Sequence, residues 1–113
     1  MPAYVKSLTF DCADALVVAR FWAATLGGEL DEDATEAKAF VEAPGWGGPN
    51  LWFQRVPEPK ESKLRLHFDL RAPGGDVAAE VERLTELGAT FAWEVDGLVV
   101  LRDPEGNEFC VEE

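Results

Sequence analysis

Residues 6–28 read KSLTFDCADALVVARFWAATLGG and contain a strand pattern, a helix start and a helix end in that order. Polar and apolar side chains alternate over residues 6–12, which is typical of a strand with one buried face. Asp14 then stands where a helix N-cap is expected, and Gly27 follows the last apolar residue of a helical run. This stretch therefore predicts a strand that leads directly into a helix.

The same pattern occurs a second time, about 60 residues later. Residues 65–70 (RLHFDL) alternate, Asp76 stands at a helix start, and Gly88 follows the last residue of the second helical run. Three short extended stretches, separated by turn residues, follow each helix: 29–33, 37–42 and 50–55, then 90–94, 98–101 and 108–112. The chain is therefore expected to hold two copies of a β-α-β-β-β module.

Residues 56–62 (VPEPKES) separate the two copies. Two prolines in a charged stretch make a semi-rigid connector. We expect one domain over residues 1–113, with module 1 at 1–57 and module 2 at 62–113. The predicted fold class is α+β, in which two βαβββ modules form a curved mixed sheet around a shared cavity.

Length and charge exclude several classes of function. A chain of 113 residues is long enough for one domain with its own core. Its net charge of −12 would repel nucleic acid and anionic membrane surfaces. No apolar run approaches the roughly 20 residues of a membrane helix, and no signal peptide pattern opens the sequence. We therefore expect a cytoplasmic protein with no nucleic-acid partner and no membrane partner.

Strand parity divides the side chains between two sheet faces, because successive residues of a strand point in opposite directions. The helix-facing set is apolar: Leu8, Phe10, Cys12, Leu51, Phe53, Leu64, Leu66, Phe68, Leu70, Phe109 and Val111. The opposite set is polar or aromatic: Ser7, Thr9, Asp11, Trp52, Gln54, Arg65, His67, Asp69, Glu108, Cys110 and Glu112. Trp52, His67 and Cys110 are unusual on a plain solvent face, so we expect this face to line a binding site. The two cysteines fall on opposite faces, which predicts that they form no disulfide.

Several of these features resemble one protein superfamily. The duplicated module, the pattern over residues 14–27 and the DPEGNEF segment at 103–109 resemble the vicinal oxygen chelate (VOC) superfamily. That superfamily includes glyoxalases, extradiol dioxygenases, fosfomycin-resistance enzymes and bleomycin-resistance proteins. Residues 8–14, 53–60 and 103–110 are similar to glyoxalase-like proteins of actinobacterial type. The resemblance covers essentially the whole chain and implies the glyoxalase/bleomycin resistance fold, a scaffold that supports many chemistries.

Metal-dependent members of that superfamily hold a divalent cation with one ligand from the first and last strand of each module. Carried over by the resemblance, these positions are Ser7 (or Thr9, if the register slips by two), Gln54, His67 and Cys110. His67 is the one strong ligand, and the thiol of Cys110 is a second candidate. We therefore expect no bound metal and no cofactor, with a divalent cation at His67 as the alternative.

The sequence leaves two interpretations open for the role of some candidate site residues. His67 is either a ligand-binding residue or a hydrogen-bonded spacer on the sheet. Cys110 is either a small buried side chain or, paired with His67, a nucleophile. Trp52 is expected to form a stacking wall of the cavity, and Trp46 to lie at a pocket rim or dimer contact.

Two functions follow from these observations. The leading hypothesis is a metal-independent, homodimeric small-molecule binding protein that sequesters an aromatic or cationic compound, like the bleomycin-resistance branch. The alternative is a lyase or isomerase-type enzyme with a degenerate metal site, in which His67 acts as acid or base. No catalytic residue is otherwise assigned. The predicted substrate-binding residues are Ser7, Thr9, Asp11, Trp52, Gln54, His67 and Cys110.

Overall fold

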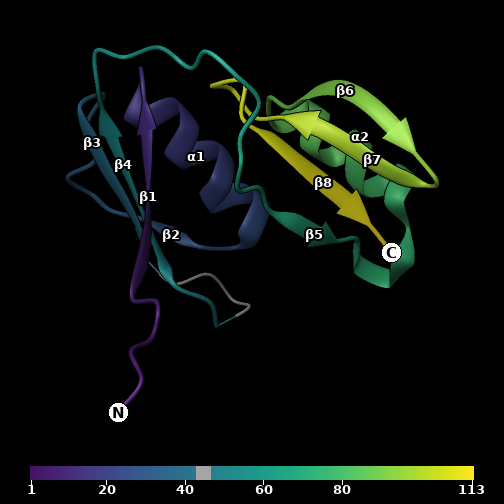
Figure 1. The fold of residues 1–113 in the computed structure, drawn as a ribbon, viewed down its shortest axis with the longest axis horizontal. Coiled ribbons are helices and arrows are strands. Elements are labelled where there is room, and N and C mark those ends of the chain that lie inside the picture. The colour runs from purple at the N-terminus through teal and green to yellow at the C-terminus, as the bar shows by residue number, and fades with distance from the viewer. Residues whose placement is uncertain (43–46) are drawn as a thin grey trace. The chain divides into compact units, whose positions relative to one another are not determined.

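A computed structural model describes residues 1–42 and 47–113. The chain divides into two compact units, Met1–Pro59 and Lys60–Glu113, each with one four-stranded sheet and one α-helix among the described residues (Figure 1). Trp46 lies outside the described residues. The two units are described in turn.

The first unit has the element order predicted from the sequence. Its elements are β1 (Ser7–Cys12), α1 (Ala15–Leu26), β2 (Glu29–Leu30), β3 (Lys38–Glu42) and β4 (Asn50–Arg55). The strand order in the sheet is β1-β4-β3-β2, with β1 parallel to β4 and the other neighbours antiparallel. Helix α1 packs on one face of this mixed sheet, chiefly against β3 and β4 (Figure 1).

Local signals set the ends of α1. Asp14 accepts hydrogen bonds from the backbone N–H groups of Leu16 (3.1 Å) and Val17 (3.2 Å). Gly27 ends the helix with a φ of 71°, a left-handed conformation that glycine adopts at low cost. The predicted N-cap and C-cap of this helix are therefore confirmed.

The core of the first unit lies between α1 and the sheet. Trp22 of the helix and Leu51 and Phe53 of β4 are fully buried. Phe10 of β1 stacks on Phe53 with ring centroids 4.9 Å apart. The apolar face predicted from strand parity is thus the face that packs against the helix, and Trp52 points away from it.

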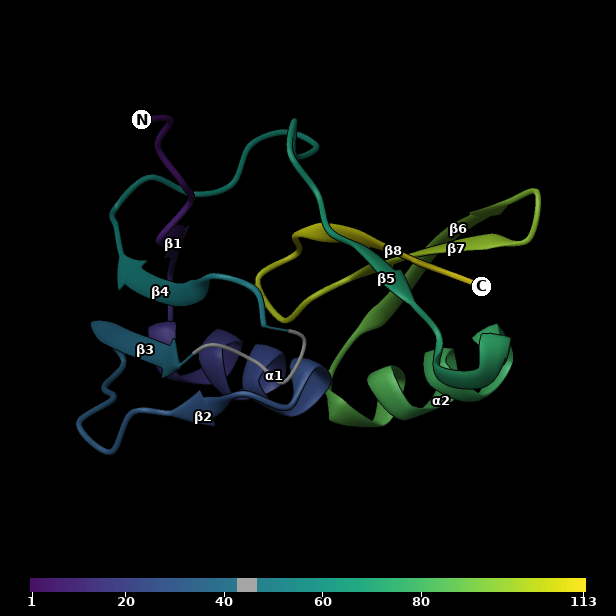
Figure 2. The same ribbon diagram turned by 90° about the horizontal axis from the view of Figure 1, so that it is seen from below.

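The second unit repeats this architecture. Strand order is β5-β8-β7-β6, with β5 parallel to β8, and α2 packs against β7 and β8 (Figure 2). Asp76 caps α2 by accepting the Ala79 N–H at 3.0 Å, and Gly88 ends it. The elements are β5 (Asp69–Arg71), the short 3-10 helix η1 (Pro73–Gly75), α2 (Val77–Leu87), β6 (Thr90–Val95), β7 (Leu98–Arg102) and β8 (Glu108–Glu112).

The strand expected over residues 65–70 is shorter than predicted. β5 begins at Asp69, and Leu66, expected beneath the helix, is 72% exposed. Ladder pairing with β8 starts where Asp69 meets Cys110. Further upstream, the side chain of Glu108 accepts the backbone N–H of Leu64 at 3.0 Å. Phe68 still accepts the backbone N–H of Cys110 at 2.8 Å, but the contact at Leu64 is to a side chain, so strand parity does not apply to the residues before Phe68.

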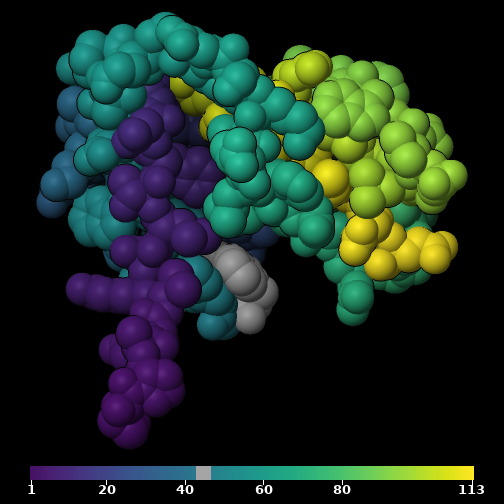
Figure 3. Space-filling model, in the orientation of Figure 1, coloured from purple at the N-terminus to yellow at the C-terminus, as the bar shows by residue number. Residues whose placement is uncertain are grey.

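Residues 1–6 precede β1 and project from the body of the first unit (Figure 3). The side chains of Met1, Tyr4 and Val5 in this segment are exposed. Among the described residues, no helix combines the length and apolar character needed to cross a membrane.

Candidate functional site

The polar face of the first sheet brings together five predicted site residues. The parallel register of β1 and β4 pairs Thr9 with Trp52 and Asp11 with Gln54. Gln54 Nε2 donates a hydrogen bond of 2.8 Å to Asp11 Oδ1. Ser7 stands at the start of the same ladder, opposite Asn50. The side chains of the Thr9–Trp52 and Asp11–Gln54 pairs thus lie next to one another.

Trp52 forms the wall of a small cavity on this face. Its ring lies 4.5 Å from the ring of Phe40, centroid to centroid, and the Nζ of Lys38 lies 5.2 Å from its centroid. The cavity measures about 180 Å³ and is lined by Thr9, Lys38, Trp52, Phe53 and Gln54. Lys38 and Phe40 were not predicted as site residues. They alternate with the buried Ala39 and Val41, so strand parity alone places them on the polar face.

A second group of site residues lies on the sheet of the second unit. Asp69 and Cys110 are direct partners in the parallel ladder of β5 and β8. His67 Nδ1 lies 3.1 Å from Asp69 Oδ1 and 4.0 Å from Cys110 Sγ. One ligand atom from each of the three residues lies within 4.8 Å of the other two. We call these residues the His67 cluster.

The thiol in this cluster is held in its protonated form. Burial raises the pKa of Cys110 above its ordinary value, and the hydrogen bond and charge of Asp69 and the charge of Glu112 act in the same direction, against a smaller opposing effect of Lys63. The thiolate is the nucleophilic form of cysteine. Cys110 is therefore poorly suited to nucleophilic attack at neutral pH. Cys12 is likewise buried, and both cysteines are free, as predicted.

Glu108, which strand parity placed on the polar face, is buried. Its side chain is 6% exposed and accepts hydrogen bonds from Lys60 Nζ (3.1 Å) and the Leu64 N–H (3.0 Å), while Arg102 Nε lies 3.9 Å away. Burial acts to raise the pKa of this carboxyl, but the hydrogen bonds from Leu64, from its own backbone and from Lys60 bring it below the ordinary value. Glu108 thus anchors the segment that enters the second unit.

The DPEGNEF segment forms the turn between β7 and β8. Asp103 is buried and accepts hydrogen bonds from the N–H groups of Glu105 (2.8 Å) and Asn107 (2.9 Å) and from the Asn107 side-chain amide (3.0 Å). Gly106 adopts a φ of 83°. The motif has a structural role, because it sets the start of β8 and with it the position of Cys110.

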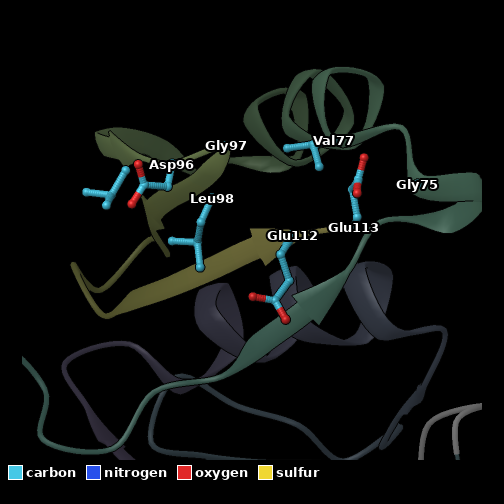
Figure 4. A pocket seen from close by; sticks show the side chains of 8 residues that line it. Gly75, Val77, Asp96, Gly97, Leu98, Glu112 and Glu113 are labelled. Carbon is cyan, nitrogen blue, oxygen red and sulfur yellow. The ribbon is translucent and has the colours of Figure 1, made fainter.

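A larger cavity lies elsewhere on the second unit, between the N-terminal end of α2, the β6–β7 turn and the end of β8 (Figure 4). It measures about 760 Å³ and is lined by Gly75, Val77, Val95, Asp96, Gly97, Leu98, Glu112 and Glu113. None of the predicted substrate-binding residues lines it. The sequence feature that marks this cavity is the Asp96-Gly97 turn, in which both residues have positive φ.

The residues at the four superfamily ligand positions do not fit a cation held by histidine and carboxylate ligands. Ser7 offers a hydroxyl, and the amide nitrogen of Gln54 is engaged with Asp11. Only His67 and Cys110 are strong donors to a transition metal. The chemistry of this donor set differs from that of a metal-dependent enzyme of the superfamily.

Comparison with known proteins gives one family match and several structural matches. A model of the glyoxalase-like domain matches residues 7–112. A protein from Bacillus cereus described as a possible glyoxalase has a TM-score of 0.71 at 18% identity, covering 99% of this chain and 100% of its own. A glyoxalase/bleomycin resistance protein/dioxygenase family enzyme from Burkholderia phytofirmans has a TM-score of 0.71 at 20% identity, covering 96% and 97%. No curated protein matches the sequence.

A third solved structure carries ligands. It is a mutant of the fosfomycin resistance protein FosX from Listeria monocytogenes, complexed with Mn(II) and a dihydroxypropylphosphonic acid. Its TM-score is 0.72 at 14% identity, with 99% of this chain and 90% of that chain covered. At such identities the matches establish the glyoxalase/bleomycin resistance fold. They give no support to the narrower resemblance to actinobacterial proteins, which stays a prediction.

Proposed function

Because the chain belongs to the glyoxalase-like domain family of the VOC superfamily, we propose that it binds a small organic molecule, aromatic or cationic, without needing a metal. Proteins of this fold are known with small molecules bound, as the FosX complex illustrates. The identity of the compound has to come from the chemistry of the site, since one scaffold serves many reactions.

The observation that supports an aromatic ligand best is the cavity beside Trp52. Its volume of about 180 Å³ is below the roughly 300–1,000 Å³ of typical ligand pockets, so it suits one ring of a ligand rather than a whole molecule. The Trp52 face offers a stacking surface, and Thr9 and Gln54 offer hydrogen bonds at its border. A flat ring with polar substituents matches this lining.

Charge supports a ligand that also carries a positive group. The net charge of the chain is −12. Asp11 lies on the same sheet face as Trp52, and its carboxylate is exposed. A cation is attracted both to such a carboxylate and to the face of an aromatic ring. His67 and Cys110, in the second unit, remain part of the proposed binding residues.

The experiment that tests this proposal is a thermal-shift screen of aromatic cations, neutral aromatic compounds and small oxo-compounds, carried out both with and without a chelator. For a compound that stabilises the protein, Trp52→Ala should weaken binding about 30-fold, which corresponds to the roughly 2 kcal/mol of an aromatic contact at the centre of a site. Tyr4→Ala is the matched control, because Tyr4 is also aromatic and exposed but precedes β1 and does not line the cavity.

Two results would contradict the proposal. One is a set of compounds that bind equally well to the Trp52→Ala variant and to the unaltered protein. The other is binding that disappears on chelation, together with one metal ion per chain that is lost at the same time. The second result would favour the enzymatic alternative.

One observation supports that alternative. Asp69 Oδ1 lies 3.1 Å from His67 Nδ1, which suits a carboxylate that orients an imidazole and fixes its tautomer. Nε2 would then be available to accept or donate a proton. We keep a lyase or isomerase-type enzyme, with His67 as acid or base, as the second candidate function. Turnover of an oxo-compound that is lost in His67→Ala would establish it.

We further propose that the two units belong to one domain and that the protein is a homodimer. The family model spans residues 7–112 and therefore both units, which supports the first part. The homodimer is supported by β6, an edge strand that leaves Phe91, Trp93 and Val95 exposed. Exposed apolar edge strands invite pairing with another chain.

A further inference from the structure

Lys38 brings a positive charge to the border of the Trp52 cavity. Its Nζ lies 5.2 Å from the centroid of the Trp52 ring, and the residue belongs to the lining of the cavity of about 180 Å³. Among the described residues that form this lining, Lys38 alone is charged. A ligand ring that stacks on Trp52 therefore lies beside an ammonium group.

The pairing of three strands sets this position. Strand β3 pairs Lys38 with Gln54 and Phe40 with Trp52 of β4, and β1 pairs Asp11 with the same Gln54. Gln54 thus lies between Asp11 on one side and Lys38 on the other. Two strand spacings separate these charged residues, which is about 10 Å between their backbones. One ligand can therefore place a positive group near Asp11 and a negative group near Lys38 at the same time.

The charge of Lys38 is not taken up by a carboxylate of its own unit. None of the ion pairs found among the described residues includes Lys38, and the Asp11 carboxylate accepts a hydrogen bond from Gln54 instead. The contacts of Lys38 with Thr35 use its backbone N–H and C=O. An ammonium group has three hydrogen-bond donors, and its contact with an aromatic face supplies no lone-pair acceptor for them. These donors can therefore bind an anionic group of a ligand.

The negative charge of the whole chain makes this local cation decisive for an anionic ligand. A net charge of −12 disfavours anions at long range, although salt screens this effect beyond about 8–10 Å. At contact distance, a hydrogen bond between an ammonium and a carboxylate is stronger than one between neutral groups. A ligand cation at the same place would instead meet a like charge, which is unfavourable. Lys38 thus distinguishes between the two signs of charge beside the Trp52 ring.

We infer that Lys38 determines which compounds the Trp52 cavity accepts: aromatic molecules with a carboxylate or similar anionic group next to the ring, whose positive group, where they have one, lies toward Asp11. The inference rests on the proposed function, because it names the chemical class of the compound that binds at Trp52.

The test compares two compounds that differ in one charge, indole-3-acetate and its neutral amide indole-3-acetamide, by calorimetric titration at fixed ionic strength. We expect the unaltered protein to bind the anion about tenfold more tightly than the amide. This ratio is the lower end of the range for a hydrogen bond to a charged group, because Lys38 is exposed. Lys38→Met should remove the preference and leave the affinity for the amide within about twofold. Lys38→Arg keeps the charge and should keep the preference.

Lys6→Met is the matched control. It removes the same charge from an exposed lysine of the first unit, but Lys6 precedes β1 and does not line the cavity. This variant should bind both compounds like the unaltered protein. Any change shared by Lys6→Met and Lys38→Met reflects the net charge of the chain, whereas a change confined to Lys38→Met reflects the contact at the cavity.

The inference is overturned if the unaltered protein binds the amide as tightly as the anion, if neither compound binds while other aromatic compounds do, or if the preference persists in a folded Lys38→Met variant. The proposed function survives each of these results as long as aromatic compounds bind and Trp52→Ala weakens their binding. It fails if no aromatic compound binds at all. Failure of the charge selectivity and failure of the proposed function are therefore separate results.

Discussion

Replacing Glu108 by Gln tests how the second unit holds the segment that precedes β5. The substitution keeps an oxygen that can accept the Leu64 N–H, now 3.0 Å from a carboxylate oxygen. It removes the negative charge that faces Lys60 Nζ at 3.1 Å and Arg102 Nε at 3.9 Å. The change therefore isolates the ionic part of the contact at nearly constant volume.

The expected loss is about 1.5 kcal/mol of unfolding free energy. A hydrogen bond to a charged group contributes about 1.5–3 kcal/mol. Lys60 is 26% exposed, so water replaces part of the lost interaction, and the lower end of that range applies. For a domain of about 100 residues this corresponds to a fall in Tm of about 6 °C.

The loss should depend on pH in a defined direction. The pKa of Glu108 is lowered from its ordinary value of 4.5 in the folded protein. A carboxyl with a lowered folded-state pKa stabilises the protein above its unfolded-state pKa, and this stabilisation disappears as the pH falls through the folded-state value. The difference between the unaltered protein and Glu108→Gln should be complete at neutral pH and shrink below pH 4.5.

Urea unfolding of both proteins at neutral and acidic pH measures this difference. Glu112→Gln is the control, because Glu112 lies on the same strand and is half-buried, and it takes part in none of the ion pairs found among the described residues. Its effect should stay within about 0.5 kcal/mol. A Glu108→Gln variant as stable as the unaltered protein at neutral pH, or a loss that is the same at every pH, would refute the reasoning.

Two further predictions concern the β7–β8 turn and the oligomeric state. Asp103→Ala should lower the unfolding free energy by about 3 kcal/mol, because it removes the acceptor of the buried donors of Asn107 and of the Glu105 N–H. Unfolding in urea measures this loss, and a loss below about 1 kcal/mol would contradict the role of the turn. Light scattering at micromolar concentration should give the mass of a dimer, and a monomeric unaltered protein would contradict this prediction. If β6 forms the contact, the double variant Phe91→Lys, Val95→Lys should be a folded monomer.

The sequence alone determined both helices and their ends. Asp14 and Asp76 cap the starts and Gly27 and Gly88 mark the ends, as expected from the residue types. Such signals act over a few residues, because a cap is a hydrogen bond between a side chain and the nearby backbone. The duplicated strand–helix–strand order follows from these local signals.

Strand parity was equally reliable wherever a strand pairs along its whole length. Leu51 and Phe53 are buried while Trp52 and Gln54 lie on the opposite face, as their alternation requires. The same rule was wrong for Leu66, because β5 begins only at Asp69. A residue outside the ladder has no defined face, and the extent of a ladder depends on its partner strand.

Only the tertiary structure determined which polar groups meet. The sequence identified His67, Asp69 and Cys110 separately, but the register of β5 against β8 makes the last two neighbours. The sequence placed Glu108 on the polar face, whereas the folded chain brings Lys60 into contact with it. Caps and alternation are encoded in neighbouring residues, but these contacts join residues more than 40 positions apart. Their formation depends on how distant segments fold back and pair, which no local pattern specifies.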